Sequence, residues 1–140
     1  MAEHRVCRTP EGSKDLPRLP QLASPLLKFN ILSEVKELHQ HDSWLRGTGR
    51  SSKTLAKYPD FRIVLISMKA NTRMHEHQAA ARISIHTLTG CVRLHLPEQA
   101  VDVPAGQLLA LDCAVPHDVE ALKESAFLLT VSWPHAMPGS

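Results

Sequence analysis

The chain has 140 residues, which suits one domain with a sizeable core. Hydrophobic residues make up 43% of it and aromatic residues only 4%, so the core is expected to be aliphatic. The net charge of +2 and the scattered basic residues speak against a nucleic-acid partner or an anionic membrane surface. There is no run long enough to span a bilayer, no signal-peptide pattern and no close-spaced cysteine pair, so a cytoplasmic protein with reduced thiols is expected.

The first half of the chain divides into an arm and a lead-in. Four prolines interrupt residues 1–25, where no hydrophobic period develops, so this segment is expected to be a disordered arm. Residues 26–52 form the lead-in. Within it, Ile31, Val35 and Leu38 recur at helical spacing after a possible N-cap at Asn30, which predicts one short helix over residues 30–41 and then a loop.

Residues 53–133 alternate between short apolar segments and turns. The segment 61–68 is apolar at nearly every position, which is typical of a strand buried on both faces. Short strands spaced by about 8 to 12 residues indicate an all-β sandwich or barrel, followed here by a tail at 134–140. The predicted strands are 53–58, 61–68, 82–88, 92–96, 101–103, 108–111, 119–122 and 127–133.

Two pairs of histidines have the spacing of metal ligands. His75 and His77 lie in an extended segment, where alternation puts both imidazoles on one face and allows them to share a metal ion. In a chain with nine histidines such a pair arises by chance about 0.6 times. His39 and His41 have the same spacing at the end of the predicted helix, where they do not share a face, so this pair is expected to bind nothing.

Glycines and a third histidine follow His75 and His77 in a recognisable order. Gly90 ends a strand after the pair, and Gly106 leads after five residues to a second turn and then to His117. This order resembles the two sequence motifs of the cupin superfamily, small jelly-roll barrels whose motifs are separated by a variable pair of strands. The resemblance covers roughly residues 53–133.

The resemblance implies a fold and a site. The expected fold is all-β, a small cupin-type jelly-roll barrel with one short N-terminal helix and a disordered arm. The implied metal ligands are His75, His77 and His117, which suit a divalent transition metal such as Fe, Mn, Ni, Cu or Zn. Cupins commonly pair through barrel strands, so a homodimer is expected, with the apolar segments 61–68 and 127–133 offering surface for it.

The chain departs from the family pattern at several positions. The family's glutamate falls on Ile83, with Arg82 beside it, so no carboxylate completes the metal site. Asp112 and Ala114 replace the proline and glycine of the second motif, and Ala121 replaces its asparagine. Three neutral imidazoles leave more positive charge on the ion, which favours an anionic substrate or a bound hydroxide.

Other polar residues near the motifs have two interpretations each. Arg82 is either a solvated charge or an anchor for a substrate carboxylate, and either Arg82 or Ile83 faces the site. Gln78 is a candidate amide ligand, although alternation points it away from the neighbouring histidine. His86 and His95 fall on the strand face opposite the core and are expected at the surface or at a subunit interface.

Three functions are compatible with these observations. The first is a mononuclear metal site acting on a small organic molecule, by oxygenase, isomerase or lyase chemistry, with no catalytic residue assigned. The second is a non-catalytic barrel that binds or senses a small molecule without a metal. The third is a structural or partner-binding barrel whose histidines no longer bind metal.

Overall fold

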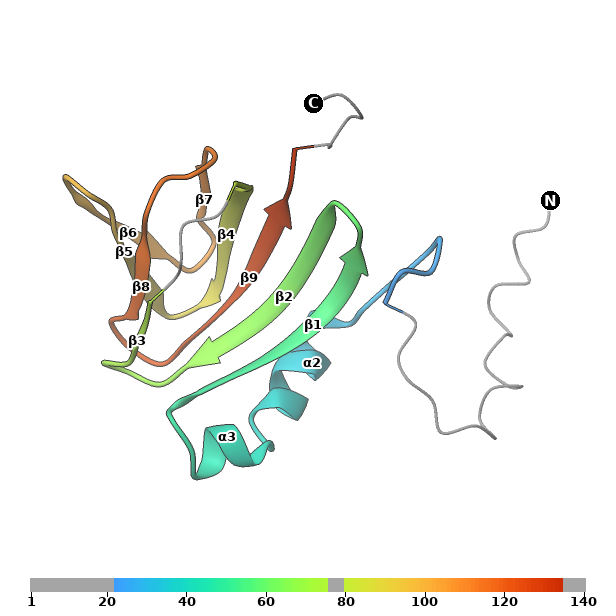
Figure 1. Cartoon of the computed structure of the whole chain (residues 1–140). Helices are drawn as coiled ribbons and strands as arrows, with labels where there is room; N and C mark the ends of the chain where they lie inside the picture. Colours follow the sequence, from blue (N-terminus) through green and yellow to red (C-terminus); the bar gives the residue numbers. More distant parts are fainter. Residues whose placement is uncertain (1–21, 76–79, 135–140) are drawn as a thin grey trace, which may run out of the picture.

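A computed structural model describes residues 22–75 and 80–134, which form two facing antiparallel sheets (Figure 1). In this part of the chain the helices are α2 (Ile31–Leu38) and α3 (Asp42–Leu45). The strands are β1 (Arg50–Tyr58), β2 (Phe61–Met68), β3 (Arg73–His75), β4 (Arg82–Thr89), β5 (Cys91–His95), β6 (Ala100–Pro104), β7 (Leu108–Leu111), β8 (Asp118–Ala121) and β9 (Ser125–Ser132).

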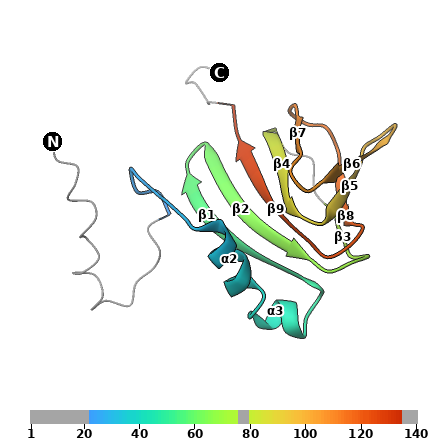
Figure 2. The same ribbon diagram turned by 180° about the vertical axis from the view of Figure 1, so that it is seen from behind.

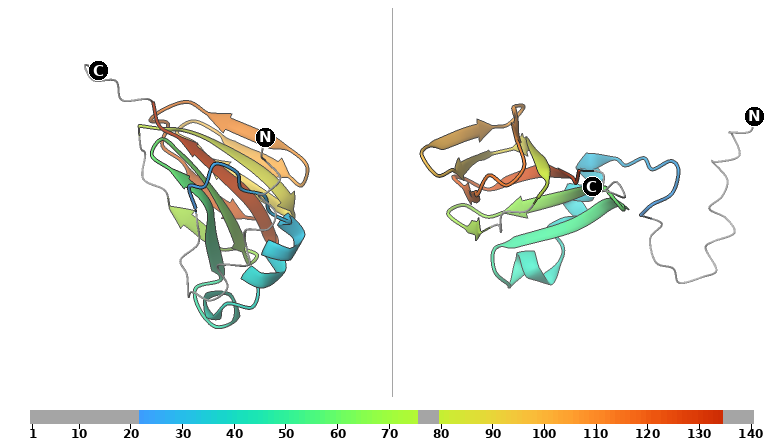
Figure 3. Two further views of the ribbon diagram at one scale, coloured as in Figure 1. Left: turned by 90° about the vertical axis from the view of Figure 1, so that its right-hand side faces the viewer. Right: turned by 45° about the horizontal axis from the view of Figure 1, so that its top comes forward.

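The strand order is that of a two-sheet jelly roll. The five-stranded sheet has the order β1-β2-β9-β4-β7 and the four-stranded sheet the order β3-β8-β5-β6. Both helices lie outside the barrel, beside β1 and β2 (Figures 2 and 3). The all-β jelly roll expected from the sequence is therefore confirmed. No helix in the described residues is long and apolar enough to cross a membrane.

Strand β2 packs side chains on both of its faces, as its largely apolar sequence predicts. Ile66 and Met68 point into the barrel and belong to its main core cluster. Leu65 points the other way and packs with Leu38 of α2 and Leu55 of β1 in a second cluster. Because alternate side chains serve two cores, this strand separates the barrel interior from the helix layer.

The predicted helix begins where its N-cap places it. The backbone N–H of Ser33 donates to the side-chain oxygen of Asn30 at 3.1 Å, and the helix ends at Leu38. The ammonium of Lys53 on β1 lies 2.6 Å from a carboxylate oxygen of Glu34 and 3.2 Å from one of Glu37. The hydrogen bond with Glu34, outweighing partial burial, raises the pKa of Lys53. These pairs tie α2 to the sheet.

The structure corrects several element boundaries, among them the end of the helix, which lies at Leu38 rather than at residue 41. The predicted loop 43–52 contains the end of α3, and β1 begins at Arg50 rather than at residue 53. A short strand, β3, forms after the predicted strand 61–68. Its Met74 is 9% exposed and packs into the core opposite Val119. Apolar burial of one side chain is enough to extend the pairing here.

Residues 22–24 lie beside the end of β1 and are bonded to it, although the sequence assigns them to the disordered arm. The N–H of Lys57 donates to the carbonyl of Leu22 at 2.8 Å, and the hydroxyl of Tyr58 donates to the carbonyl of Ser24 at 2.8 Å. The rest of the predicted arm, and the predicted tail beyond Pro134, fall outside the described residues.

The two apolar strands expected to carry a homodimer lie inside the five-stranded sheet. Strand β2 pairs with β1 and β9, and β9 pairs with β2 and β4, so neither has a free edge. Their side chains pack in the two core clusters. The homodimer stays a prediction, and these strands do not supply the surface proposed for it.

Candidate functional site

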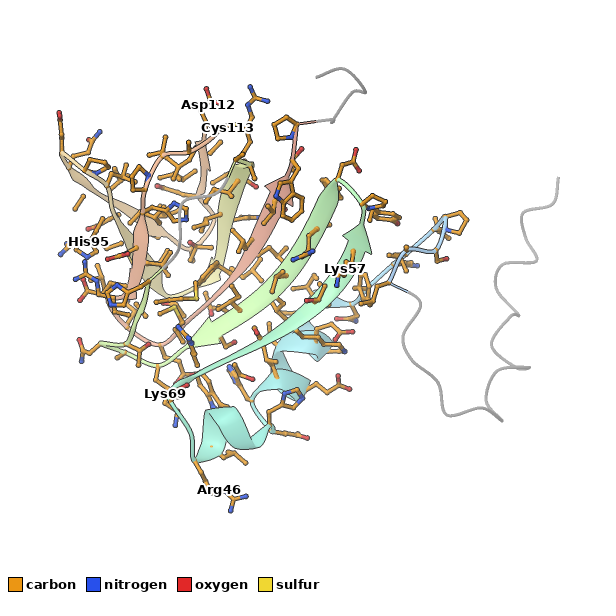
Figure 4. The ribbon with its side chains drawn as sticks, viewed as in Figure 1. Arg46, Lys57, Lys69, His95, Asp112 and Cys113 are labelled. Carbon is orange, nitrogen blue, oxygen red and sulfur yellow. The ribbon has the colours of Figure 1, made fainter. Side chains whose placement is uncertain are left out.

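A cavity of about 240 Å³ opens at one end of the barrel, where β2 and β4 begin and β7 and β9 end. Its walls are mostly apolar, as in most small-molecule sites. Asp112 marks this end of the molecule in Figure 4. The lining residues are Arg62, Val64, Ala81, Ile83, Leu111, Asp112, Val115, His117, Leu129, Val131 and Trp133.

The cavity is the outermost layer of the barrel interior. Val64 stands opposite Leu129 in the β2–β9 register, and both side chains face inward with Ile83 of β4. Two residues further along the same strands, Ile66 and Ile85 are buried in the core. Alternation therefore turns the ends of these strands into cavity walls and their middles into core.

Arg62 lies on this inward face, two residues before Val64 on β2. Its guanidinium carbon lies 5.0 Å from the centroid of the Trp133 ring, within cation–π distance. Its Nε is buried and has no hydrogen-bond partner among the described residues. A buried polar atom without a partner is uncommon and calls for an explanation.

Arg62 is not among the site residues expected from the sequence, because it lies in the segment 61–68, which is apolar at nearly every position and reads as a buried strand. The same alternation that assigns Ile66 to the core assigns Arg62 and Val64 to its face. A charged residue in phase with core residues, one residue from the start of a strand, is the sequence feature that identifies it.

Arg82, which the sequence leaves open as a solvated charge or a carboxylate anchor, points away from the cavity. Its side chain is 66% exposed, and its Nε donates to a carboxylate oxygen of Asp112 at 2.9 Å. Arg82 is not among the residues that line the cavity, whereas the neighbouring Ile83 is. Of the two residues that the sequence left open, Ile83 therefore faces the cavity.

Asp112 lines the rim of the cavity, and its carboxylate already accepts hydrogen bonds from Arg82 and Cys113. The backbone N–H of Cys113 donates to the same carboxylate oxygen at 2.7 Å. This hydrogen bond, followed by the nearby charge of Arg82, lowers the pKa of Asp112. Both labelled side chains stand at the end of the barrel in Figure 4. No carboxylate in the described part of the chain forms an ion pair with Arg62.

His117 also lines the cavity. Its Nδ1 lies 3.0 Å from the carbonyl oxygen of Val115, and since a carbonyl only accepts, Nδ1 carries the proton. In the neutral imidazole, this hydrogen bond leaves Nε2 as the nitrogen with the lone pair. A backbone carbonyl that fixes the tautomer in this way is a common support for a metal-binding histidine.

The side chain of His75 lies on the outer, solvent-facing side of β3. Its Nδ1 donates to a carboxylate oxygen of Asp118 at 3.1 Å, and its side chain is 75% exposed. Arg73 donates to the same oxygen at 3.2 Å. Burial raises the pKa of Asp118, but these hydrogen bonds outweigh it, so the net shift is downward. Met74, which lies between Arg73 and His75 in β3, points inward. Because side chains alternate along a strand, His75 points outward.

The predicted ligands are thus only partly placed. His117 lines the cavity, and His75 faces outward on β3, so the structure does not bring these two together. His77 and Gln78 lie outside the described residues. Within residues 22–75 and 80–134, no three side chains of histidine, cysteine, aspartate or glutamate are grouped to hold a metal ion.

The remaining histidines have structural surroundings. His86 is exposed on the outer face of β4. His95 donates from Nε2 to Glu120 at 2.7 Å on the outer face of β5, at the edge of the view in Figure 4. His39 stacks on Trp44 with ring centroids 4.2 Å apart and lies 3.2 Å from the hydroxyl of Ser67.

Neither a protein-family model nor a curated protein sequence matches the chain. Solved structures do. A cupin superfamily protein from Desulfitobacterium hafniense is similar over 61% of this chain and 78% of its own, with a TM-score of 0.59 and 16% identity. The chain has the cupin fold.

Two other structures with this fold belong to proteins that have a specific name. KdgF from Halomonas sp. is similar over 62% of this chain and 82% of its own, with a TM-score of 0.57 and 18% identity. A variant of salicylate 1,2-dioxygenase from Pseudoaminobacter salicylatoxidans matches 81% of this chain and 37% of its own, with a TM-score of 0.69 and 11% identity. At these identities the likeness is one of fold.

Proposed function

We propose that this cupin barrel binds a small organic molecule in the cavity at its mouth, beside a divalent transition metal held through His117. The observation that carries the proposal is the cavity itself, an apolar pocket lined by His117, whose Nδ1 donates to the carbonyl of Val115. One similar structure is a dioxygenase of a small aromatic acid by its name, which is consistent with such a site.

The size of the cavity limits the ligand. Liquid water occupies about 30 Å³ per molecule, so roughly 240 Å³ corresponds to about eight waters. A ligand of about eight to ten non-hydrogen atoms fits this space. That is smaller than a drug-sized molecule or a nucleotide cofactor, whose sites are about 300 to 1,000 Å³.

The metal part of the proposal rests on His117 and His77, with His75 as the third ligand. The chemistry of His117 fits a metal ion, because the hydrogen bond of Nδ1 to Val115 leaves Nε2 as the atom that a neutral imidazole offers to a metal. His75 fits only if it leaves Asp118. A bound divalent ion would supply Lewis-acid catalysis or an activated water, and the reaction is not assigned.

The metal content of single variants tests this part. The protein, purified without chelator and without a histidine tag, should contain about one equivalent of a transition metal, which His117→Ala and His77→Ala should lose. His41→Ala removes an exposed histidine outside the cavity and should keep it. The metal content of His75→Ala decides whether His75 leaves Asp118. A wild type that stays metal-free after anaerobic reloading would contradict the metal site.

The alternative function is a binding or sensing barrel without a metal. The contact between His75 and Asp118 favours it, because this contact occupies one of the three predicted ligands. In this case a small molecule should bind equally well with and without a strong chelator. Calorimetric titration under both conditions separates the two functions.

A further inference from the structure

We infer that Arg62 selects a small monocarboxylate as the ligand of this cavity. The inference rests on the proposed function, since it names the class of molecule that the same cavity binds. It starts from the position of Arg62 on the inward face of β2, at the layer where the barrel interior opens into the cavity.

The guanidinium of Arg62 has no acceptor within the described protein. An arginine keeps its positive charge under all ordinary conditions. Its buried Nε has no hydrogen-bond partner, and no described carboxylate forms an ion pair with it. The one other buried side-chain polar atom in this state, Oγ1 of Thr87, does not line the cavity. An anionic ligand would supply the missing acceptor.

The neighbouring acid does not neutralise Arg62. Asp112 lines the same cavity, but it accepts from Arg82 at 2.9 Å and from the backbone N–H of Cys113 at 2.7 Å. The charge of Arg82 offsets that of Asp112 at the rim. The positive charge of Arg62 is therefore left for a ligand.

The chemistry of the walls favours a carboxylate with a single charge. The planar guanidinium fork matches the two oxygens of a carboxylate, and the Trp133 ring at 5.0 Å restricts its movement. Most other lining residues are aliphatic, so a second charge on the ligand would be desolvated without a partner. A phosphate, with nearly two charges, would meet only one cation. The remaining apolar walls suit a hydrocarbon body.

The test compares acids with their neutral amides. Binding to the purified protein is measured by calorimetry for butanoate, hexanoate, octanoate and benzoate, and for the matching primary amides. Each amide has the shape of its acid without the charge. Hydrogen bonds to charged groups predict that the best acid binds the wild type about 10- to 100-fold more tightly than its amide.

Three variants assign the preference to a residue. Arg62→Met keeps the length and apolar stem of the side chain and should reduce the acid-to-amide ratio to about one. Arg82→Met removes the exposed arginine at the rim, and Arg93→Met removes one that is paired with Asp102 on the outer sheet. Both should keep the preference. Circular dichroism of all variants checks that they fold.

Each outcome supports or overturns the inference. If acids and amides bind the wild type equally, or Arg62→Met keeps the preference, the inference is wrong while the cavity remains a binding site. Loss of the preference in Arg82→Met alone would assign the anchor to Arg82. If neither acids nor amides bind, the proposed function of the cavity fails, and the inference fails with it.

Discussion

The guanidinium carbon of Arg62 lies 5.0 Å from the centroid of the Trp133 ring, and both residues line the cavity. Trp133 directly follows β9, the strand that pairs with β2 along its whole length. The pair thus joins the tryptophan of the cavity to an arginine that has no ion-pair partner among the described residues. An indole so close to a charged group reports on changes in that group's surroundings.

The fluorescence of Trp133 should respond to a carboxylate ligand. The chain has two tryptophans, and Trp44 lies away from the cavity, stacked on His39. In a Trp44→Phe protein, titration with the best-binding acid should change the tryptophan emission, because the acid alters the charge beside the indole. In Trp133→Phe, where Trp44 remains, the same titration should give no change. A response from Trp44 would contradict this placement of the site.

Replacing Arg62 by methionine should stabilise the ligand-free protein. The substitution removes a buried donor without a partner, which costs about 1 to 3 kcal/mol in typical proteins. We expect the free energy of unfolding to rise by about 1 kcal/mol, seen as a higher urea midpoint at an unchanged slope. Arg93→Met, on the exposed face, is the control and should not raise the midpoint. A lower midpoint for Arg62→Met would show that Arg62 has a protein partner.

The two glycines of the motifs should differ in their tolerance of alanine. Both have positive φ, +79° at Gly90 and +88° at Gly106. A Cβ at Gly90 would lie 2.3 Å from the carbonyl oxygen of Glu124, whereas one at Gly106 would meet nothing within 4 Å.

Gly106→Ala should therefore cost only the backbone strain, about 1 to 2 kcal/mol of unfolding free energy. Gly90→Ala should cost more than about 3 kcal/mol, since strain and a backbone clash combine. Urea denaturation of the two variants measures the difference. Equal losses would mean that the turn at Gly90 relaxes to admit the side chain.

The pH dependence of stability should change when Asp112 is replaced. The Cys113 hydrogen bond, then Arg82, holds the pKa of Asp112 below its usual 3.8 in the folded protein. A lowered folded-state pKa adds stability above the unfolded pKa, and this is lost as the pH falls through the folded value. Asp112→Asn should therefore lower the urea midpoint at pH 6 and leave it nearly unchanged near pH 2. A similar loss at both pH values would assign the effect to packing.

Much of the fold follows from local patterns that the sequence displays. The largely apolar run predicts a strand between two cores, and Asn30 marks the helix start because its side chain accepts from Ser33. The site is harder. Alternation predicts that residues two apart share a face, but it does not predict which face points inward. At β3 the burial of Met74 decides this, and His75 faces solvent.

The position of Arg62 also depends on information that local patterns do not contain. Its phase with Ile66 was readable from the sequence, but the end of the barrel at which the core stops being filled was not. That depends on how the ends of β2, β4, β7 and β9 meet, which is a property of long-range pairing. The charge of Arg62 distinguishes it from the core residues of β2, but local alternation alone does not show that a cavity lies beside it.

Residues 22–24 have a consequence beyond the fold. Strand β1 is the first strand of its sheet, and an unpaired strand edge is a template for association with another chain. The carbonyl of Leu22 accepts from the backbone N–H of Lys57 near the end of β1, and the carbonyl of Ser24 accepts from the side-chain hydroxyl of Tyr58. A protein that lacks residues 1–24 would leave this backbone donor of the edge strand without its partner. We expect such a truncated protein to aggregate through β1. Residues 22–24 would then protect the edge of the sheet from pairing with a second chain.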